Sequence, residues 1–299
     1  MLRPLPPQGL IDEERTGVAL RDLRGRRLVW LRGFAVSPPE TAIAFGYLST
    51  RLPTPLLHGP HGWYRLDTAR HMLIPSRGDR VSLTSGTIVV AHAGPTFTVE
   101  RRDHVLIRGL APTFQIVSQR LVQAGSTLLD VEKGRRWKLP PRCLFAGFRE
   151  RTLVLACGIA HGAEGAAPMI LEQMAPGRTA RQITQRLAQL IPDVAALSPD
   201  GAWVAVEGFT GCAASYVYVA PAGGGRARLV YGKTPTDPFS SNYSTLLGWS
   251  ADGRLVVLLE PPHCDEPRPP RPPTGVFLVD PRTLARTFVT RNATAMWSR

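Results

Sequence analysis

The chain has 299 residues, of which 43% are hydrophobic, so it can bury a sizeable core and is not a disordered protein. No stretch approaches the roughly 18 consecutive apolar residues of a membrane-spanning helix, so no transmembrane segment is predicted. The net charge is +13, and arginine supplies most of it because lysine occurs only at Lys133, Lys138 and Lys233. This charge favours an acidic ligand, but no run of five or six basic residues marks a nucleic-acid-binding tail.

The N-terminal segment 1–17 is predicted to be a tail. Its first seven residues contain no apolar core of a secretory signal peptide. The sequence therefore favours a cytoplasmic protein, or an extracytoplasmic one if an upstream anchor has been removed.

Short β-rich runs joined by turns follow from residue 18 onwards and predict antiparallel hairpins. Glycine and proline, at 28 residues each, supply many turn positions. The hairpins predicted in the first two thirds of the chain span residues 18–30, 34–45, 63–74, 80–91, 97–107, 114–124, 127–139, 143–156 and 169–183. A short helix is an alternative to a strand at the end of this region, because apolar residues have helical spacing at Ile183, Leu187, Leu190 and Ile191.

The clearest internal repeat lies in the last third of the chain. Residues 194–206 and 246–258 lie 52 residues apart, and each consists of an apolar run, a Ser-x-Asp-Gly turn and a second apolar run. The Asp-Gly pair supplies the positive φ that a tight hairpin requires. Hairpins of a second type, over 216–230 and 276–289, follow the two repeats.

The alternation of the two hairpin types predicts an all-β fold built from four-stranded units of the size of a propeller blade. The strand at 295–298 resembles the one at 247–250 and can complete the N-terminal hairpin. We therefore predict a β-propeller of four-stranded blades, with seven blades favoured and six as the alternative. Residues 18–299 would form a single domain, and 18–31 and 293–299 would share the closing blade, which removes exposed sheet edges.

The two Ser-x-Asp-Gly turns, Ser198-Pro199-Asp200-Gly201 and Ser250-Ala251-Asp252-Gly253, are each followed by an apolar strand. They resemble the repeats of TolB-type and WD-repeat-like propellers. The resemblance is loose over the first 190 residues, where the Asp-Gly pair is lost. It implies a propeller fold over most of the chain and, less directly, a protein-interaction role, because this fold also hosts enzymes.

Many of the arginines lie in the turns of the second hairpin type, which a propeller would bring to one side. Arginines gathered there could bind phosphate or carboxylate groups through bidentate hydrogen bonds. Carboxylates in the same turns favour local ion pairing instead. The anion-binding candidates are Arg26, Arg27, Arg101, Arg102, Arg135 and Arg136. The interleaved aromatic residues of a stacking platform are missing, so nucleic acid is not predicted as a partner.

The opposite face would carry the long connections 46–62, 157–168, 207–215, 231–245 and 259–275. Functional residues concentrate on loops that a rigid scaffold holds. The partner-binding candidates on these connections are His58, His61, His161, Glu207, His263 and Asp265. The favoured function is a monomeric, non-catalytic scaffold that binds a protein or peptide. The alternative is a hydrolase or lyase acting on a carbohydrate or peptide at the channel mouth, which requires several of these side chains to converge.

No catalytic motif, metal-ligand spacing or cofactor motif is recognisable. The pair His58-x-x-His61 is interrupted by Gly59 and Pro60, which deny it the helix on which such a pair would bind a metal. We therefore predict neither a metal nor a cofactor.

The four cysteines form two candidate pairs. Cys212 and Cys264 lie 52 residues apart, which is the blade spacing, and this pair is the favoured disulfide. Cys143 and Cys157 are equidistant from the turn at 149–151 and would face each other across a hairpin. Disulfides would place the protein outside the cytoplasm, in tension with the missing signal peptide, whereas two pairs of reduced thiols need no further explanation.

Overall fold

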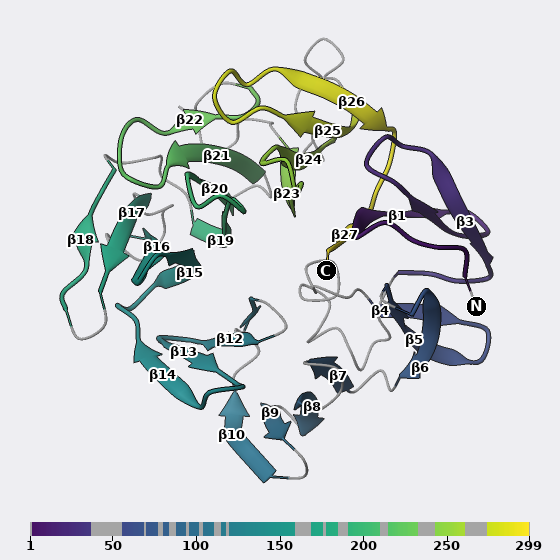
Figure 1. The fold of residues 1–299 in the computed structure, drawn as a ribbon, viewed down its shortest axis with the longest axis horizontal. Coiled ribbons are helices and arrows are strands. Elements are labelled where there is room, and N and C mark those ends of the chain that lie inside the picture. Colours follow the sequence, from purple (N-terminus) through teal and green to yellow (C-terminus); the bar gives the residue numbers. More distant parts are fainter. Residues whose placement is uncertain are drawn as a thin grey trace. The chain divides into compact units, whose positions relative to one another are not determined.

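The computed structural model is all-β, and its described residues contain no helix (Figure 1). The structure describes residues 2–36, 56–68, 70–76, 80–83, 88–93, 96–101, 104–110, 115–117, 120–158, 169–175, 178–184, 191–209, 215–232, 243–260 and 274–298. Within these ranges no helix is long and apolar enough to cross a membrane. The chain forms two compact units, Met1–Leu139 with Asn292–Arg299, and Pro140–Arg291.

The two ends of the chain meet in one sheet of the first unit. Its strands run in the order β27 (Ala295–Ser298), β1 (Gln8–Glu14), β2 (Gly17–Arg21) and β3 (Arg27–Arg32). The last strand pairs antiparallel with β1, and Gly9 lies opposite Trp297. The Trp297 side chain is fully buried, and its indole N–H donates a hydrogen bond to the Pro6 carbonyl at 3.2 Å. Residues 8–14 are therefore part of a sheet rather than a tail.

Three further antiparallel sheets complete the described part of the first unit. Their strands are β4 (Leu56–Gly59), β5 (Gly62–Asp67) and β6 (Met72–Ser76); β7 (Arg80–Leu83), β8 (Ile88–Ala93), β9 (Thr96–Arg101) and β10 (His104–Leu110); and β11 (Gln115–Ile116), β12 (Leu121–Ala124), β13 (Thr127–Asp130) and β14 (Arg135–Lys138). Each strand pairs with the next one along the chain, as the predicted hairpins require.

The second unit repeats the same four-strand order. Its strands are β15 (Cys143–Arg149), β16 (Thr152–Gly158), β17 (Met169–Met174) and β18 (Arg181–Gln182); β19 (Ile191–Leu197), β20 (Trp203–Phe209), β21 (Ser215–Pro221) and β22 (Arg228–Leu229); and β23 (Tyr243–Trp249), β24 (Leu255–Glu260), β25 (Gly275–Val279) and β26 (Arg286–Thr290). The last two groups join into one eight-stranded sheet where β21 and β23 pair in parallel through Ser215 and Tyr243.

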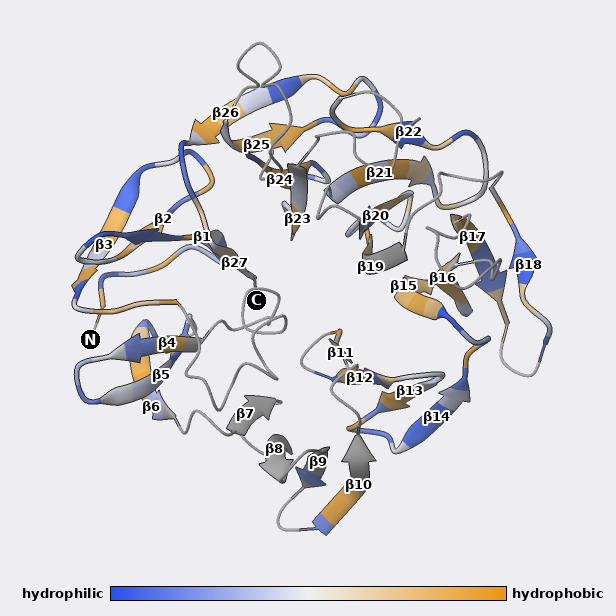
Figure 2. Cartoon of the chain, turned by 180° about the vertical axis from the view of Figure 1, so that it is seen from behind, coloured by the Kyte–Doolittle hydropathy of each residue, from blue (hydrophilic) through white to orange (hydrophobic). Residues whose placement is uncertain are grey.

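In two of the sheets the last strand is less buried than the strands before it. In the sheet β15–β18, the side chains of β16 from Leu153 to Cys157 are buried, whereas both residues of β18 are exposed. Strand β14, the last of its sheet, is likewise mostly hydrophilic (Figure 2). Apolar side chains of the first three strands therefore form the core, and charged side chains cover the outer strand.

The Ser-x-Asp-Gly turns close the hairpins β19–β20 and β23–β24, as the sequence predicts. In the first turn the Trp203 amide donates to Ser198 Oγ at 2.9 Å, and the Ser198 hydroxyl donates to Asp200. Gly201 adopts a φ of +69°, which a residue with a Cβ rarely tolerates. The serine and aspartate thus satisfy the turn locally, while glycine supplies its conformation.

The second turn carries a pH-dependent contribution to stability. The side chain of Arg254 and then the hydroxyl of Ser250 donate hydrogen bonds to Asp252, and they lower the pKa of this carboxyl although burial opposes the shift. A lowered pKa stabilises the fold above the unfolded-state pKa of about 3.9, and this contribution is lost as the pH falls through the folded-state pKa. The Asp252 side chain is 55% exposed, so solvent screening keeps the effect small.

We expect Asp252→Ala to lower the melting temperature by about 1–3 °C at pH 7 and by less below about pH 3. Thermal unfolding followed by circular dichroism at both pH values measures the difference. A loss that is as large at pH 3 as at pH 7 would show that the charge of Asp252 contributes nothing.

Two expectations from the sequence need correction or lie beyond the described residues. The sequence allowed a short helix around Ile183. The described residues on either side are strands instead, because Arg181–Gln182 is β18 and Ile191 begins β19. Residues 185–190 and most of the predicted hairpin 34–45 lie outside the described residues.

Candidate partner-binding site

The candidate site is built on a tight turn between β4 and β5. This turn lies at the end of the segment 46–62, which the sequence predicts to be a long connection. Strands β4 and β5 pair with Gly59 opposite Gly62, so only Pro60 and His61 lie in the turn. Gly62 has a φ of +121°, which favours glycine. The fully buried side chains of Leu57 and Leu66 fix the two strands to the core of the first unit.

Aromatic rings lie on both faces of this hairpin. On one face His58, whose side chain is exposed, lies opposite Trp63, and their ring centroids are 4.8 Å apart. On the other face Phe34 lies 5.4 Å from the half-buried ring of Tyr64. Pro60 and His61 are exposed between them. We call this set the aromatic turn, and its residues are Phe34, His58, Pro60, His61, Trp63 and Tyr64.

The backbone holds the aromatic turn in place. Ala35 and His58 exchange two backbone hydrogen bonds of 2.8 Å, which tie the segment before β4 to the hairpin. A Cβ at Gly59 would lie 2.6 Å from the Phe34 ring and 2.9 Å from the Tyr64 ring. Only glycine therefore allows these two rings to close over the turn.

Glu207, which the sequence placed among the partner-binding residues, has a structural position instead. Its side chain lies on β20 and is buried, with only 5% of its surface exposed. The Ser215 hydroxyl donates to Glu207 Oε1 at 3.0 Å, and the Leu246 amide donates to Oε2 at 2.9 Å. The carboxylate therefore joins β20 to β21 and to the next group of strands at β23.

Ser244 completes the contact between these strands. Its hydroxyl accepts a hydrogen bond from the Val217 amide at 3.0 Å. The Ser215 hydroxyl shares its one proton between Glu207 and the Ser244 carbonyl, which lies 3.0 Å from it. A carboxylate held by two internal donors in a closed polar network is poorly placed to bind a partner or to act as a base. The assignment of Glu207 to a partner-binding surface is therefore not supported by its geometry.

Of the six partner-binding candidates, the structure brings together His58 and His61, which lie on the same turn. His161, His263 and Asp265 lie outside the described residues. Sequence reasoning singled out the two histidines and missed Trp63 as part of the same site. The signal that could have found it is the dipeptide Trp63-Tyr64 directly after a Gly-Pro-His-Gly turn.

The anion-binding candidates whose side chains the structure describes are exposed on the surface. Arg26 Nε lies 3.3 Å from Asp22, and the guanidinium of Arg27 lies 5.8 Å from the Trp30 ring. Arg136 donates to the Leu106 carbonyl at 3.2 Å. Arg135 is exposed on β14, while the side chain of Arg101 and the whole of Arg102 lie outside the described residues. A common binding site for an anion stays a prediction.

Asp130 shows how a carboxylate in one of these turns is neutralised. Burial disfavours the charged form of the Asp130 carboxyl. Against this, the guanidinium of Arg120 donates to Oδ2 at 2.6 Å, and the Lys133 amide donates to Oδ1 at 2.9 Å. Together these donors lower the pKa of the carboxyl. Asp130 therefore binds Arg120 and its own turn, although Arg135 lies opposite it in the sheet.

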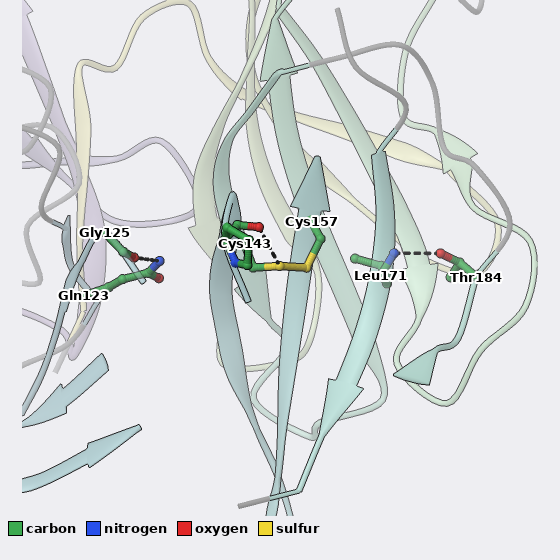
Figure 3. Close-up of a disulfide and its surroundings, with 7 residues drawn as sticks. Gln123, Gly125, Cys143, Cys157, Leu171 and Thr184 are labelled. Carbon is green, nitrogen blue, oxygen red and sulfur yellow. Dashed lines mark hydrogen bonds between the residues drawn. A yellow bond between two sulfur atoms is a disulfide. The ribbon is translucent and has the colours of Figure 1, made fainter. Parts of the chain in front are cut away.

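The structure joins the cysteine pair that the sequence favoured less. Cys143 and Cys157 lie opposite each other on β15 and β16 and form a disulfide (Figure 3). Cys212 and Cys264, the pair favoured from the repeat spacing, lie outside the described residues. The turn at 149–151 indicated that the two cysteines face each other, and the register of β15 with β16 bears this out.

Comparison with solved structures extends the description of the fold. Over 96% of its length the chain resembles 49% of oligopeptidase B from Leishmania major, with a TM-score of 0.51 and 13% identity. It also resembles a TolB protein from Agrobacterium tumefaciens (TM-score 0.38, 13% identity, 90% of this chain and 87% of that one). A third structure is the WD40 domain of Sif2 (TM-score 0.38, 11% identity, 87% and 95%). The successive four-stranded antiparallel sheets are the blades of a β-propeller.

These comparisons describe the fold of the propeller and not its activity. No protein-family model matches the sequence, and no curated protein matches it. The chain spans about half of the oligopeptidase B chain and 37% of a prolyl endopeptidase that it also resembles. A β-propeller can host an enzyme or a binding protein, so the fold alone does not decide between catalysis and binding.

Proposed function

We propose that this propeller is a non-catalytic scaffold that binds a protein or peptide partner through the aromatic turn. The observation that carries the proposal is the pairing of an exposed His58 with Trp63 beside the exposed Pro60 and His61. Aromatic rings with a polar edge give large contact area at a low cost in side-chain entropy, and they dominate the binding energy of many protein interfaces. Sheets that are fixed by a buried core hold these rings in one arrangement.

In this proposal the chain is a monomer that closes as a ring of seven four-stranded blades. The shared sheet of β27 and β1 to β3 would be the closing blade, and the sheets of the two units would supply the other six. The turns that connect the second strand of a blade to its third, such as the aromatic turn, would then lie on one face. The segments that carry His161, Glu207 and His263 would belong to the same kind of connection, and Glu207 would serve to join blades.

The chemistry of the site and of the chain defines the partner. An extended peptide that carries proline or aromatic residues would stack on His58 and Trp63. Acidic residues in the same peptide would be attracted by the net charge of +13. The proposal therefore commits to an acidic peptide segment with aromatic or proline anchors.

A peptide selection tests the proposal. A phage-displayed library of random peptides is selected on the immobilised protein, and the enriched peptides are titrated by calorimetry. We expect Trp63→Ala to weaken their binding by at least about 10-fold, because truncation of an aromatic anchor costs about 2 kcal/mol or more.

The matched control is Trp30→Ala, since Trp30 has a similar partial exposure on β3 of the same unit. This variant should bind the selected peptides with the affinity of the parent protein. If no peptide is enriched, or if both tryptophan variants bind equally well, the aromatic turn is not the binding site.

A further inference from the structure

Two cysteines and a carboxylate lie together in the second unit. The sulfur atoms of Cys143 and Cys157 and a carboxylate oxygen of Glu172 all lie within 4.8 Å of one another. Glu172 on β17 lies opposite Leu155, so its side chain is on the same face of the sheet as that of Cys157. Three adjacent strands therefore bring two sulfur atoms and one oxygen to a single place. Figure 3 shows the two cysteines on their neighbouring strands.

Glu172 lacks a partner in the described part of the chain. Its carboxylate makes no hydrogen bond or ion pair there, and burial alone raises the pKa of this group. The neighbouring strand β16 supplies apolar groups on this face, since Leu155 and Cys157 are buried there. A half-buried carboxylate without a positive partner is unfavourable, and a bound cation would compensate it.

We propose that the reduced form of this cluster binds a zinc ion through the thiolates of Cys143 and Cys157 and the carboxylate of Glu172. Thiolate ligands favour zinc over the hard cations calcium and magnesium, which take oxygen ligands. Zinc–sulfur distances of about 2.3 Å and zinc–oxygen distances of about 2.0–2.2 Å place tetrahedral ligand atoms about 3.3–3.8 Å apart. The span of the cluster accommodates this arrangement and leaves one position for water.

The disulfide and the zinc site exclude each other. A dithiol reductant transfers two electrons and two protons to the Cys143–Cys157 bond and is itself oxidised to a disulfide. Zinc then binds the two sulfur atoms and releases the two thiol protons. Oxidation of the dithiol removes both thiolates at once, so the metal affinity depends on the redox state of the protein.

The sequence did not indicate this site. Positions 143, 157 and 172 have no recognised zinc-ligand spacing, and the first two are separated by a whole hairpin. Their proximity arises because the hairpin register places Cys143 opposite Cys157, while β17 returns along β16.

The test uses the full chain with Cys212→Ser and Cys264→Ser, which removes the remaining thiols. One sample is reduced with dithiothreitol and desalted without oxygen, and a second sample is kept oxidised. We expect one zinc per chain in the reduced sample and none in the oxidised one, measured by elemental analysis after removal of unbound metal. Cobalt added to the reduced sample should show thiolate-to-metal charge-transfer absorption.

Glu172→Gln in the reduced background should weaken zinc binding by at least about 10-fold, and Glu132→Gln, which alters an exposed carboxylate, should leave it unchanged. A reduced parent that retains no zinc would overturn the proposal, as would a Glu172→Gln variant that binds zinc as tightly as the parent. The comparison of reduced with oxidised protein uses one polypeptide, so it stays decisive if a variant fails to fold.

Discussion

Glu207→Ala is expected to lower the free energy of unfolding by about 3 kcal/mol. The change leaves the Leu246 amide without its acceptor in a buried position, and it opens a small cavity beside Ser215. An unsatisfied buried donor costs about 1–3 kcal/mol, and the cavity adds to that cost. Urea unfolding followed by circular dichroism measures the loss.

The matched control for this prediction is Glu132→Ala, because Glu132 is an exposed carboxylate. Its effect should stay within about 0.5 kcal/mol, although it lies 3.7 Å from Arg120. If Glu207→Ala unfolds like the parent protein, the carboxylate does not join the strands as described. Peptide binding by the variant should be retained where it is folded, because Glu207 is not part of the aromatic turn.

Trp297→Ala is expected to have the largest effect, a loss of about 4 kcal/mol. The indole is fully buried in the cluster that includes Leu5, Ile11 and Leu20, and truncation of a buried tryptophan costs about 3–5 kcal/mol. The loss would fall on the sheet that both chain ends share. The same unfolding experiment measures it, with Trp30→Ala as the control at about 1 kcal/mol or less.

A second variant tests the same contact between β1 and β27 from the side of β1. A Cβ at Gly9 would lie 2.2 Å from the Trp297 ring and 2.4 Å from the Arg21 carbonyl. Gly9→Ala should therefore also destabilise the protein, because neither the ring nor the backbone can move away without loss of packing. Full stability of both Gly9→Ala and Trp297→Ala would contradict the pairing of β1 with β27.

The sequence predicted the structure best at turns whose conformation is determined by their own residues. The hairpins around Asp200 and Asp252 could be predicted because serine, aspartate and glycine define the turn locally. Strand β1 could not be recognised in the same way, because its polar residues hid the pattern of a buried strand. Arg21 Nε lies 2.8 Å from the buried Asp12, and this contact joins two strands that the sequence alone does not align.

Only part of the candidate site could be predicted from the sequence. The histidines at 58 and 61 were identified as chemically unusual residues on a presumed loop, but the strand β4 that holds His58 was missed because glycine and proline surround it. The burial of Glu207 could not be read from the sequence for a different reason. Its partners Ser215 and Leu246 lie 8 and 39 residues away, and only the pairing of β21 with β23 brings them together.

The most direct test of the aromatic turn as a binding site is photo-crosslinking at single positions. A benzophenone amino acid replaces His61 in one sample and Arg24, an exposed residue of the turn between β2 and β3, in the other. Each sample is irradiated with a peptide from the selection, and the attached peptide is mapped by mass spectrometry. The proposed function predicts a crosslink from position 61 and none from position 24. Equal labelling at the two positions, or labelling at position 24 alone, would contradict it.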